Sequence, residues 1–234
     1  MKEIMCIAVA FCICFMMSSQ TLYAIGTGSS VIFPPDSKPY GLSNEQHIKN
    51  FWKWIISFPK ERNPWNDPTG ANCDNGQSKT NSSVFYLSGN GGGVSVRTCK
   101  VPAGKSLFIP VSPEEISDKE APKSSVDDLN NIAKKDQDSV TSLYLKIDNK
   151  EFNRQDLSKY RTHTAPFEVV YPKNAIFGAT EGSSKAVADG YYVITQPLAK
   201  GPHTIQFKSS LICPGTGCMQ PNFAQDVKYN LVVQ

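Results

Sequence analysis

The sequence predicts a mainly β protein: an antiparallel β-sandwich of jelly-roll or immunoglobulin-like type, with one or two short amphipathic helices. From residue 84 to the C-terminus, short runs rich in β-branched and aromatic residues recur between turns of Gly, Pro, Asn and Asp. No regular helical pattern alternates with these runs. Strands that follow one another in this way pack as two facing sheets and do not form a parallel α/β sheet.

The N-terminus predicts an export signal over residues 1–24. Lys2 precedes an apolar run from Ile4 to Met17, and small and polar residues lead from there to Ala24. The run is shorter than the roughly 20 residues that a membrane-spanning helix needs, which favours cleavage after Ala24 over a retained anchor. The mature protein is therefore expected in the periplasm or outside the cell, with no stable membrane anchor.

Cysteine usage supports an oxidising compartment. The chain has seven cysteines, and removal of residues 1–24 takes away three of them. The remaining four are expected to pair locally, as Cys73 with Cys99 and Cys213 with Cys218. Closing these two loops would stabilise the fold by about 3.5 and 2 kcal/mol. Free thiols and a metal site are the alternatives. The sequence has neither a paired cysteine motif nor a histidine close to a cysteine, which disfavours the metal site.

Length and charge limit the organisation and the partners. About 210 mature residues suffice for one domain, which we place over residues 43–234 after a flexible Gly/Ser/Pro-rich leader over residues 25–42. The formal net charge is +3, with both signs mixed along the chain. This balance argues against a nucleic-acid partner, which would require a clustered basic face.

Two amphipathic helices are predicted. Ser43 and Gln46 form a capping box, and the apolar stripe that follows it ends before Pro59. This stripe consists of Ile48, Phe51, Trp52 and Ile55. Its aromatic rings are expected to face the core, with a ligand groove as the alternative. The second helix is predicted over residues 126–135, with acidic residues in its first turn and lysines in its last.

The strand pattern begins as a meander and continues to the C-terminus. Strands are predicted over residues 84–87, 94–101, 107–111, 143–147, 167–171, 191–195, 203–207 and 227–233. A hairpin turn is expected at residues 148–150. The acidic segment 112–120, which reads SPEEISDKE, is predicted to be a solvated loop.

No motif for a catalytic reaction or a cofactor is found, so the sequence predicts neither catalytic residues nor a cofactor. The binding candidates belong to the turn-rich segment 63–77 and the strand that Cys99 ties to it: Trp65, Asp67, Asp74, Gln77 and Arg97. Asp67 and Asp74 are expected to accept loop N–H groups and pair with Arg97, the alternative being a calcium site. Trp65 is expected to be an exposed stacking surface.

The mature chain resembles a widespread family of exported bacterial and archaeal proteins. The resemblance rests on Asn63-Pro64, Asp67, Thr69-Gly70, Cys73 and Gly76-Gln77, then on Arg97-Thr98-Cys99 and Val101 to Lys105, Asp189 to Tyr192, Pro197-Leu198 and Gly201 to Ile205. It covers nearly the whole mature chain and implies a single domain in the bacterial envelope or beyond it. It implies no reaction. Other members often carry Asn and a further Cys after the strand over residues 107–111, where this chain reads PVSPEEIS.

Export, β architecture and the absence of a catalytic motif together favour a non-enzymatic binding protein that recognises a glycan or an envelope protein. The first alternative is a secreted, glycan-directed hydrolase with carboxylates from segments 63–77 and 112–120. The second is a structural component of the envelope, which would expose a large apolar patch or an unpaired strand edge.

Overall fold

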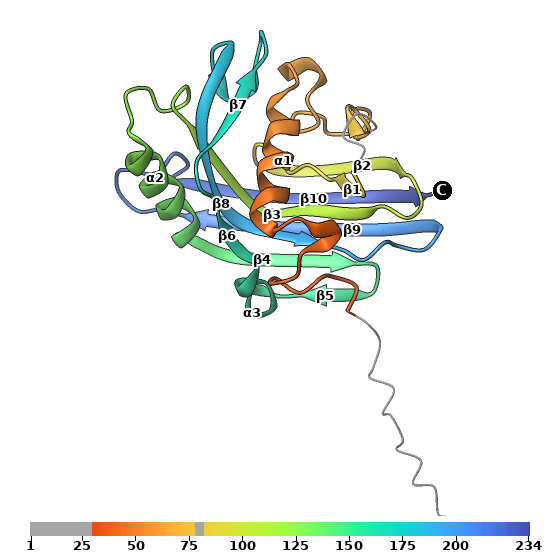
Figure 1. Cartoon of the computed structure of the whole chain (residues 1–234). Coiled ribbons are helices and arrows are strands. Elements are labelled where there is room, and N and C mark those ends of the chain that lie inside the picture. Colours follow the sequence, from red (N-terminus) through yellow and green to blue (C-terminus); the bar gives the residue numbers. More distant parts are fainter. Residues whose placement is uncertain (1–29, 78–81) are drawn as a thin grey trace, which may run out of the picture.

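Two five-stranded sheets face each other in the computed structural model, which describes residues 30–77 and 82–234 (Figure 1). In the first sheet, β1 (Val84–Tyr86), β3 (Ser106–Ser117), β8 (Gly182–Ile194) and β6 (Arg161–His163) lie in that order, and β7 (Phe167–Tyr171) also pairs with β8. In the second, the order is β2 (Gly93–Val101), β10 (Asn222–Val233), β9 (Gly201–Ile212), β4 (Val140–Ile147) and β5 (Lys150–Phe152). The predicted β-sandwich is confirmed.

The main core lies between the two sheets. Alternate residues of each strand point into it, as the period of two requires. Leu107, Ile109 and Val111 come from the first sheet, and Phe207 and Tyr229 are among those that face them from the second. On β10, Val227, Tyr229, Leu231 and Val233 are buried, so they form the inward-facing set of this strand.

Helix α1 (Asn44–Ile56) covers the outer face of the first sheet (Figure 1). The Ser43 hydroxyl accepts a hydrogen bond from the Gln46 N–H, and the Gln46 side chain accepts one from the Ser43 N–H, so the predicted capping box is confirmed. The four residues of the predicted stripe are all buried in a second core against β1, β3, β7 and β8. The core-facing interpretation of this stripe is therefore correct.

The predicted flexible leader needs correction over the residues that are described. Ile32 is 3% exposed and forms an antiparallel bridge with Thr195, and Phe33 donates its N–H to the carbonyl of Ile194. The tyrosine hydroxyl of Tyr40 hydrogen-bonds to Ser106 at 2.8 Å. Residues 30–42 thus pack on the sandwich, because their few apolar groups find a place beside β8. The predicted signal peptide, residues 1–24, lies outside the described residues.

The predicted meander is also wrong. Strand β1 pairs with β3 in parallel, and β2 belongs to the opposite sheet, where it pairs in parallel with β10. The chain therefore crosses between the sheets before and after β2, and the remaining pairs are antiparallel. Local turn signals identify the strands but carry no information about these long-range partners. The hairpin at residues 148–150, which joins β4 to β5, is confirmed.

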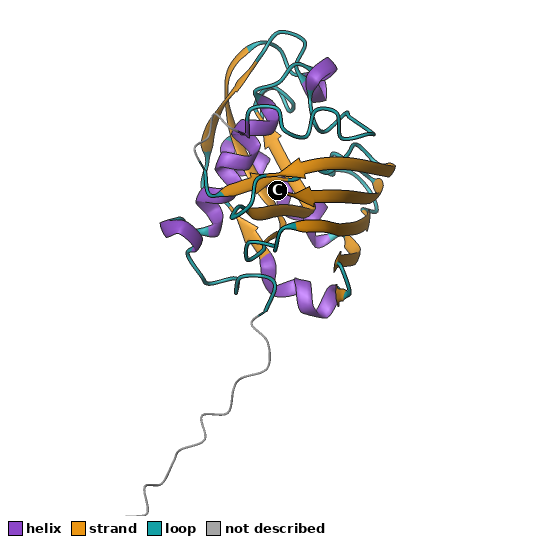
Figure 2. Cartoon of the chain, turned by 90° about the vertical axis from the view of Figure 1, so that its right-hand side faces the viewer, coloured by secondary structure: helices purple, strands orange, loops and turns teal. Residues whose placement is uncertain are grey.

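Helix α2 (Val126–Asp138) covers the far ends of β3 and β8 and extends three residues beyond the predicted range. Its residues Leu129 and Ala133 pack on Ile116 and Val187 in a third, smaller core. Seen from the side, the helices and loops lie around the sheets (Figure 2). Shorter helical segments, which the sequence did not predict, are α3 (Arg154–Leu157) and the 3-10 turns Pro39–Gly41, Lys60–Arg62, Ser158–Tyr160 and Ile176–Gly178. No helix in the described part of the chain is long and apolar enough to cross a membrane.

Candidate functional site

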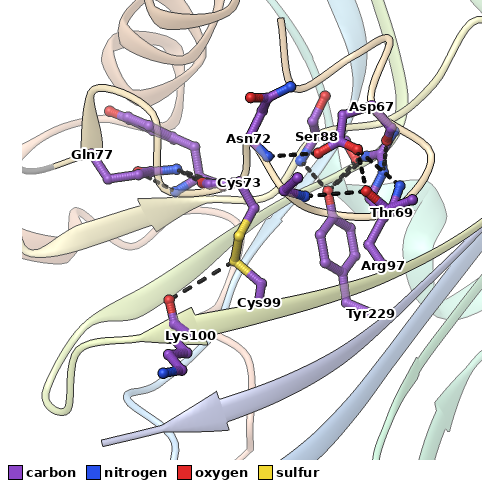
Figure 3. Close-up of a disulfide and its surroundings, with 12 residues drawn as sticks. Asp67, Thr69, Asn72, Cys73, Gln77, Ser88, Arg97, Cys99, Lys100 and Tyr229 are labelled. Carbon is purple, nitrogen blue, oxygen red and sulfur yellow. Dashed lines mark hydrogen bonds between the residues drawn. A yellow bond between two sulfur atoms is a disulfide. The ribbon is translucent and has the colours of Figure 1, made fainter. Parts of the chain in front are cut away.

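The predicted disulfide between Cys73 and Cys99 is present and joins the turn-rich segment 63–77 to β2 (Figure 3). Beside it, the Asp67 carboxylate accepts hydrogen bonds from the N–H and hydroxyl of Thr69, both at 2.9 Å, and from the N–H of Asn72 at 2.7 Å. Burial by itself would raise the pKa of Asp67, but these hydrogen bonds and one from Gly70 lower it below its usual value. Asp67 therefore holds its own loop together as an anion.

Arg97 does not pair with the two aspartates, contrary to the prediction. Its guanidinium is 1% exposed and donates to the main-chain carbonyls of Asp67 at 2.6 Å, Ser88 at 2.7 Å and Trp65 at 3.3 Å, and to the Tyr229 hydroxyl at 2.7 Å. Figure 3 shows this arrangement around Tyr229. The fork of five donors suits a loop whose carbonyls converge, because each buried carbonyl needs a donor. Arg97 is a clamp between β2 and segment 63–77.

The other candidates of this segment are also structural or exposed. The Gln77 side chain donates to the carbonyls of Cys73 and Tyr86 and accepts from the Tyr86 N–H, so it extends the edge of β1 as another strand would. Asp74 is exposed. Among the described residues, the one group of three metal-ligand types with atoms within 4.8 Å consists of Asp136 with Cys213 and Cys218. These two cysteines form the second predicted disulfide, so their sulfur atoms are not free to bind a metal as thiolates.

Trp65 is buried, which corrects the prediction of an exposed stacking surface. Its side chain is 6% exposed, and its ring lies 5.9 Å from that of Trp52 and 5.7 Å from that of Phe177, measured between ring centroids. The clamp of Arg97 on the Trp65 carbonyl fixes the loop from which this ring projects. The three rings form an aromatic wall contributed by α1, segment 63–77 and the turn at Ile176–Gly178.

Segment 112–120 is not a solvated loop. Residues up to Ser117 continue strand β3, and Glu114 and Glu115 are 6% and 4% exposed. The register shifts between Pro110 and Ser112, which is a β-bulge. Before the bulge, the odd-numbered residues of β3 face the main core. After the bulge, the even-numbered residues face that side, so Ile116 packs on α2. The odd-numbered Glu115 therefore points to the opposite face of the sheet, on the side of α1 and β7. Opposite the bulge stands Gly190, where a Cβ atom would collide with the Ser112 carbonyl.

A cavity of about 220 Å³ lies along the free edge of this extended part of β3. Strand β1 pairs with only residues 106–108 of β3, so no described strand pairs with that edge farther along. Residues from both faces of β3 therefore reach the cavity. We call it the acidic pocket; its walls are the aromatic residues Trp52, Trp65 and Phe177 and the acidic residues Glu114, Glu115 and Glu120.

Both carboxyl oxygens of Glu115 are buried without a hydrogen-bond partner among the described residues, and no hydrogen bond contributes to the pKa of Glu114. Burial raises the pKa of both groups well above the usual value, and acidic neighbours raise it further. A buried ionised carboxylate without a donor or a cation is strongly unfavourable, so burial favours the protonated form of both groups.

Glu120 forms a carboxyl pair with Glu115. One oxygen of Glu120 accepts hydrogen bonds from the N–H and hydroxyl of Ser117, at 2.9 and 2.8 Å, and from the Tyr171 hydroxyl at 2.9 Å. Burial raises the pKa of Glu120, although these donors oppose the rise. Because Glu120 has donors and Glu115 has none, Glu120 is the more readily ionised of the two, and its charge raises the pKa of Glu115.

The rim of the acidic pocket comes from the loop that Cys213 and Cys218 close. Met219 and Gln220 line the pocket, and Met219 donates its N–H to the carboxylate of Asp136 at 3.2 Å. Burial raises the pKa of Asp136 to about 6 despite hydrogen bonds from both loop residues. On the other side of the pocket, Phe177 is 39% exposed and has φ of 60°, a conformation that a bulky residue rarely adopts.

A larger cavity of about 870 Å³ lies beside α1, between Gly76 and Ser82. Its lining includes Gly76 and Ser82, which stand on either side of the segment 78–81 that the structure does not describe. The sequence analysis named segment 112–120 as a source of carboxylates for a hydrolase, but it predicted neither the acidic pocket nor the burial of Glu114 and Glu115 nor the part of Phe177. The one available signal was Ile116, an apolar residue directly after the acidic pair that is out of place in a solvated loop.

Comparison with known proteins adds no assignment: no protein-family model, curated protein or solved structure matches this chain. The resemblance to an exported family therefore stays a prediction. The chemistry of the site must be argued from its own residues.

Proposed function

We propose that this chain is an exported, non-enzymatic binding protein and that the acidic pocket holds one residue of an envelope glycan. The observation that carries the proposal is the pocket itself, which three aromatic and three acidic residues line together and in which the buried Glu115 carboxyl group has no hydrogen-bond partner among the described residues. A sugar ring has apolar C–H faces for aromatic rings and hydroxyl groups that donate to carboxyl oxygens. Small-ligand sites have this composition, with apolar walls and a few convergent polar groups.

Export is part of the same proposal. The two disulfides support it, because such bonds form and persist in oxidising compartments. The signal predicted over residues 1–24 and the resemblance to an exported family agree with it.

The test is a glycan array followed by titration of the hits, with tryptophan fluorescence as the readout because Trp52 and Trp65 line the pocket. Phe177→Ala removes one ring of the wall and should weaken binding by about three- to tenfold. Val170→Ala is the matched control, since Val170 is an exposed apolar residue of β7 and does not line the pocket. Absence of any glycan binding, or an equal loss in both variants, would overturn the proposal.

A glycan-directed hydrolase is the second candidate. The observation that favours it is the protonated Glu115 beside Glu120, since a carboxyl group with a raised pKa is suited to general acid catalysis. Release of reducing ends from a bound glycan, abolished in Glu115→Gln, would favour the hydrolase over the binding protein.

A further inference from the structure

Resting on the proposed glycan-binding function, we infer that the sugar held in the acidic pocket carries a free ammonium group, which binds against Glu114 and Glu115. The proposal names the chemical class of the ligand, an amino sugar, and the end of the pocket that recognises its charge. It depends on the charges of the groups in the pocket, on their hydrogen-bond partners and on the volume of the pocket.

Among the described residues, the acidic pocket contains acidic side chains and no basic one. The charged groups that act on Glu114 and Glu115 are all acidic, and no lysine or arginine lines the pocket. Arg161, the cation that pairs with the neighbouring Asp189, is already used: it donates to both carboxylate oxygens of Asp189 at 2.9 Å and to Asp138 at 2.6 Å. The titratable groups of neighbouring elements that surround Glu114 and Glu115 are Glu120, Asp136, Tyr171, Asp189 and Tyr192. The described residues of the pocket therefore offer acidic groups and no cation of their own.

The donor inventory points the same way. Glu114 and Glu115 offer carboxyl oxygens that no described donor occupies. An ammonium group has three N–H donors and no acceptor, so it can satisfy several of these oxygens at once. The faces of Trp52, Trp65 and Phe177 also attract a cation, because the π-system of an aromatic ring is negative on its face. A hydroxyl group brings a single donor and no charge.

Size restricts the ligand further. The volume of about 220 Å³ is below the roughly 300–1,000 Å³ of pockets for drug-sized molecules. One sugar ring is the appropriate scale, and a longer glycan would extend past the exposed edges of Phe177 and Met219.

Binding of the cation is coupled to release of a proton. In the free protein, burial and the neighbouring Glu120 raise the pKa of Glu115 and favour its protonated form. When the ammonium group enters, that proton leaves for the solvent, and the resulting carboxylate accepts hydrogen bonds from the ammonium. The ammonium keeps its own proton count, so each binding event releases up to one proton, and affinity rises with pH while the ligand stays charged.

The test compares sugars of matched shape, namely glucosamine, glucose and N-acetylglucosamine, by calorimetric titration at about pH 6.5 in two buffers of different ionisation enthalpy. Glucosamine is expected to bind at least about tenfold more tightly than either neutral sugar. Its affinity should fall with added salt, and its apparent enthalpy should depend on the buffer. Glu115→Gln and Glu114→Gln should each remove most of the preference, and the exposed Glu168→Gln should not. Melting temperatures check that each variant is folded.

The possible failures are distinguishable. If glucose or N-acetylglucosamine binds as tightly as glucosamine, the inference about charge is wrong and the glycan-binding function stands. If the preference persists in both glutamine variants, the ammonium group binds elsewhere and the inference is wrong. If no sugar, charged or neutral, binds here or on the array, the proposed function fails together with the inference.

Discussion

Two buried polar regions of this molecule differ in how their hydrogen bonds are completed. Around Arg97 and Asp67, donors and acceptors match, so the guanidinium meets carbonyls and the carboxylate meets N–H and hydroxyl groups. Around Glu114 and Glu115, acceptors meet other acidic groups. A completed network stabilises a fold, whereas an incomplete one is costly and marks a place where a ligand can supply what is missing.

The largest effect is expected from breaking the completed region. Arg97→Ala should destabilise the protein by about 4 kcal/mol or more, because it leaves several buried carbonyls without donors and a cavity beside Tyr229. The measurement is urea unfolding, with the exposed Arg62→Ala as control, for which a change within about 0.5 kcal/mol is expected. If both variants unfold at the same urea concentration, the clamp does not stabilise the fold.

The two disulfides should separate stability from binding. Replacing Cys73 and Cys99 by Ser opens a loop with a sequence separation of 26 and should cost about 3.5 kcal/mol, whereas opening the pair Cys213 and Cys218, with a separation of 5, should cost about 2 kcal/mol. Only the second change frees the loop that carries Met219 and Gln220 to the pocket. Glycan titration of both variants should therefore show weaker binding in the less destabilised one. The reverse order of affinities would mean that the rim is unimportant.

The smallest expected effect is a gain in stability, whereas the two preceding changes are expected to reduce stability. Because the pKa values of Glu114 and Glu115 are raised in the folded state, folding takes up protons as pH rises above the usual glutamate value, and stability falls over that window. Asp136 adds to the fall up to about pH 6. Glu115→Gln removes one of these penalties and should stabilise the protein by about 2 kcal/mol at about pH 8, with little change at about pH 4.

Thermal unfolding across this pH range measures the effect, and Glu168→Gln, at an exposed position of β7, is the control. A loss of stability in Glu115→Gln at the alkaline end would show that Glu115 is ionised and partnered in the folded protein. The comparison between the two polar regions would then be wrong.

Several features were readable from the sequence because their causes are local. The capping box at Ser43, the stripe of α1 and the turn after β4 each depend on residues within a few positions of one another. The two cysteine pairs follow from an even count and short separations. The sandwich class follows from the number and kind of strands. The sequence by itself determined these elements and the chemistry available at segments 63–77 and 112–120.

The tertiary structure alone decided where that chemistry lies. Segment 112–120 has the composition of a solvated loop, yet pairing with β8 and the cover of α2 bury it as strand. The bulge at residues 110–112 sets which way Glu115 faces, and the shortness of β1 leaves the edge of β3 open. Trp65 became part of the wall because Arg97, 32 positions along the chain, holds its carbonyl. Burial, pairing and register are properties of contacts between distant residues, so no local pattern encodes them.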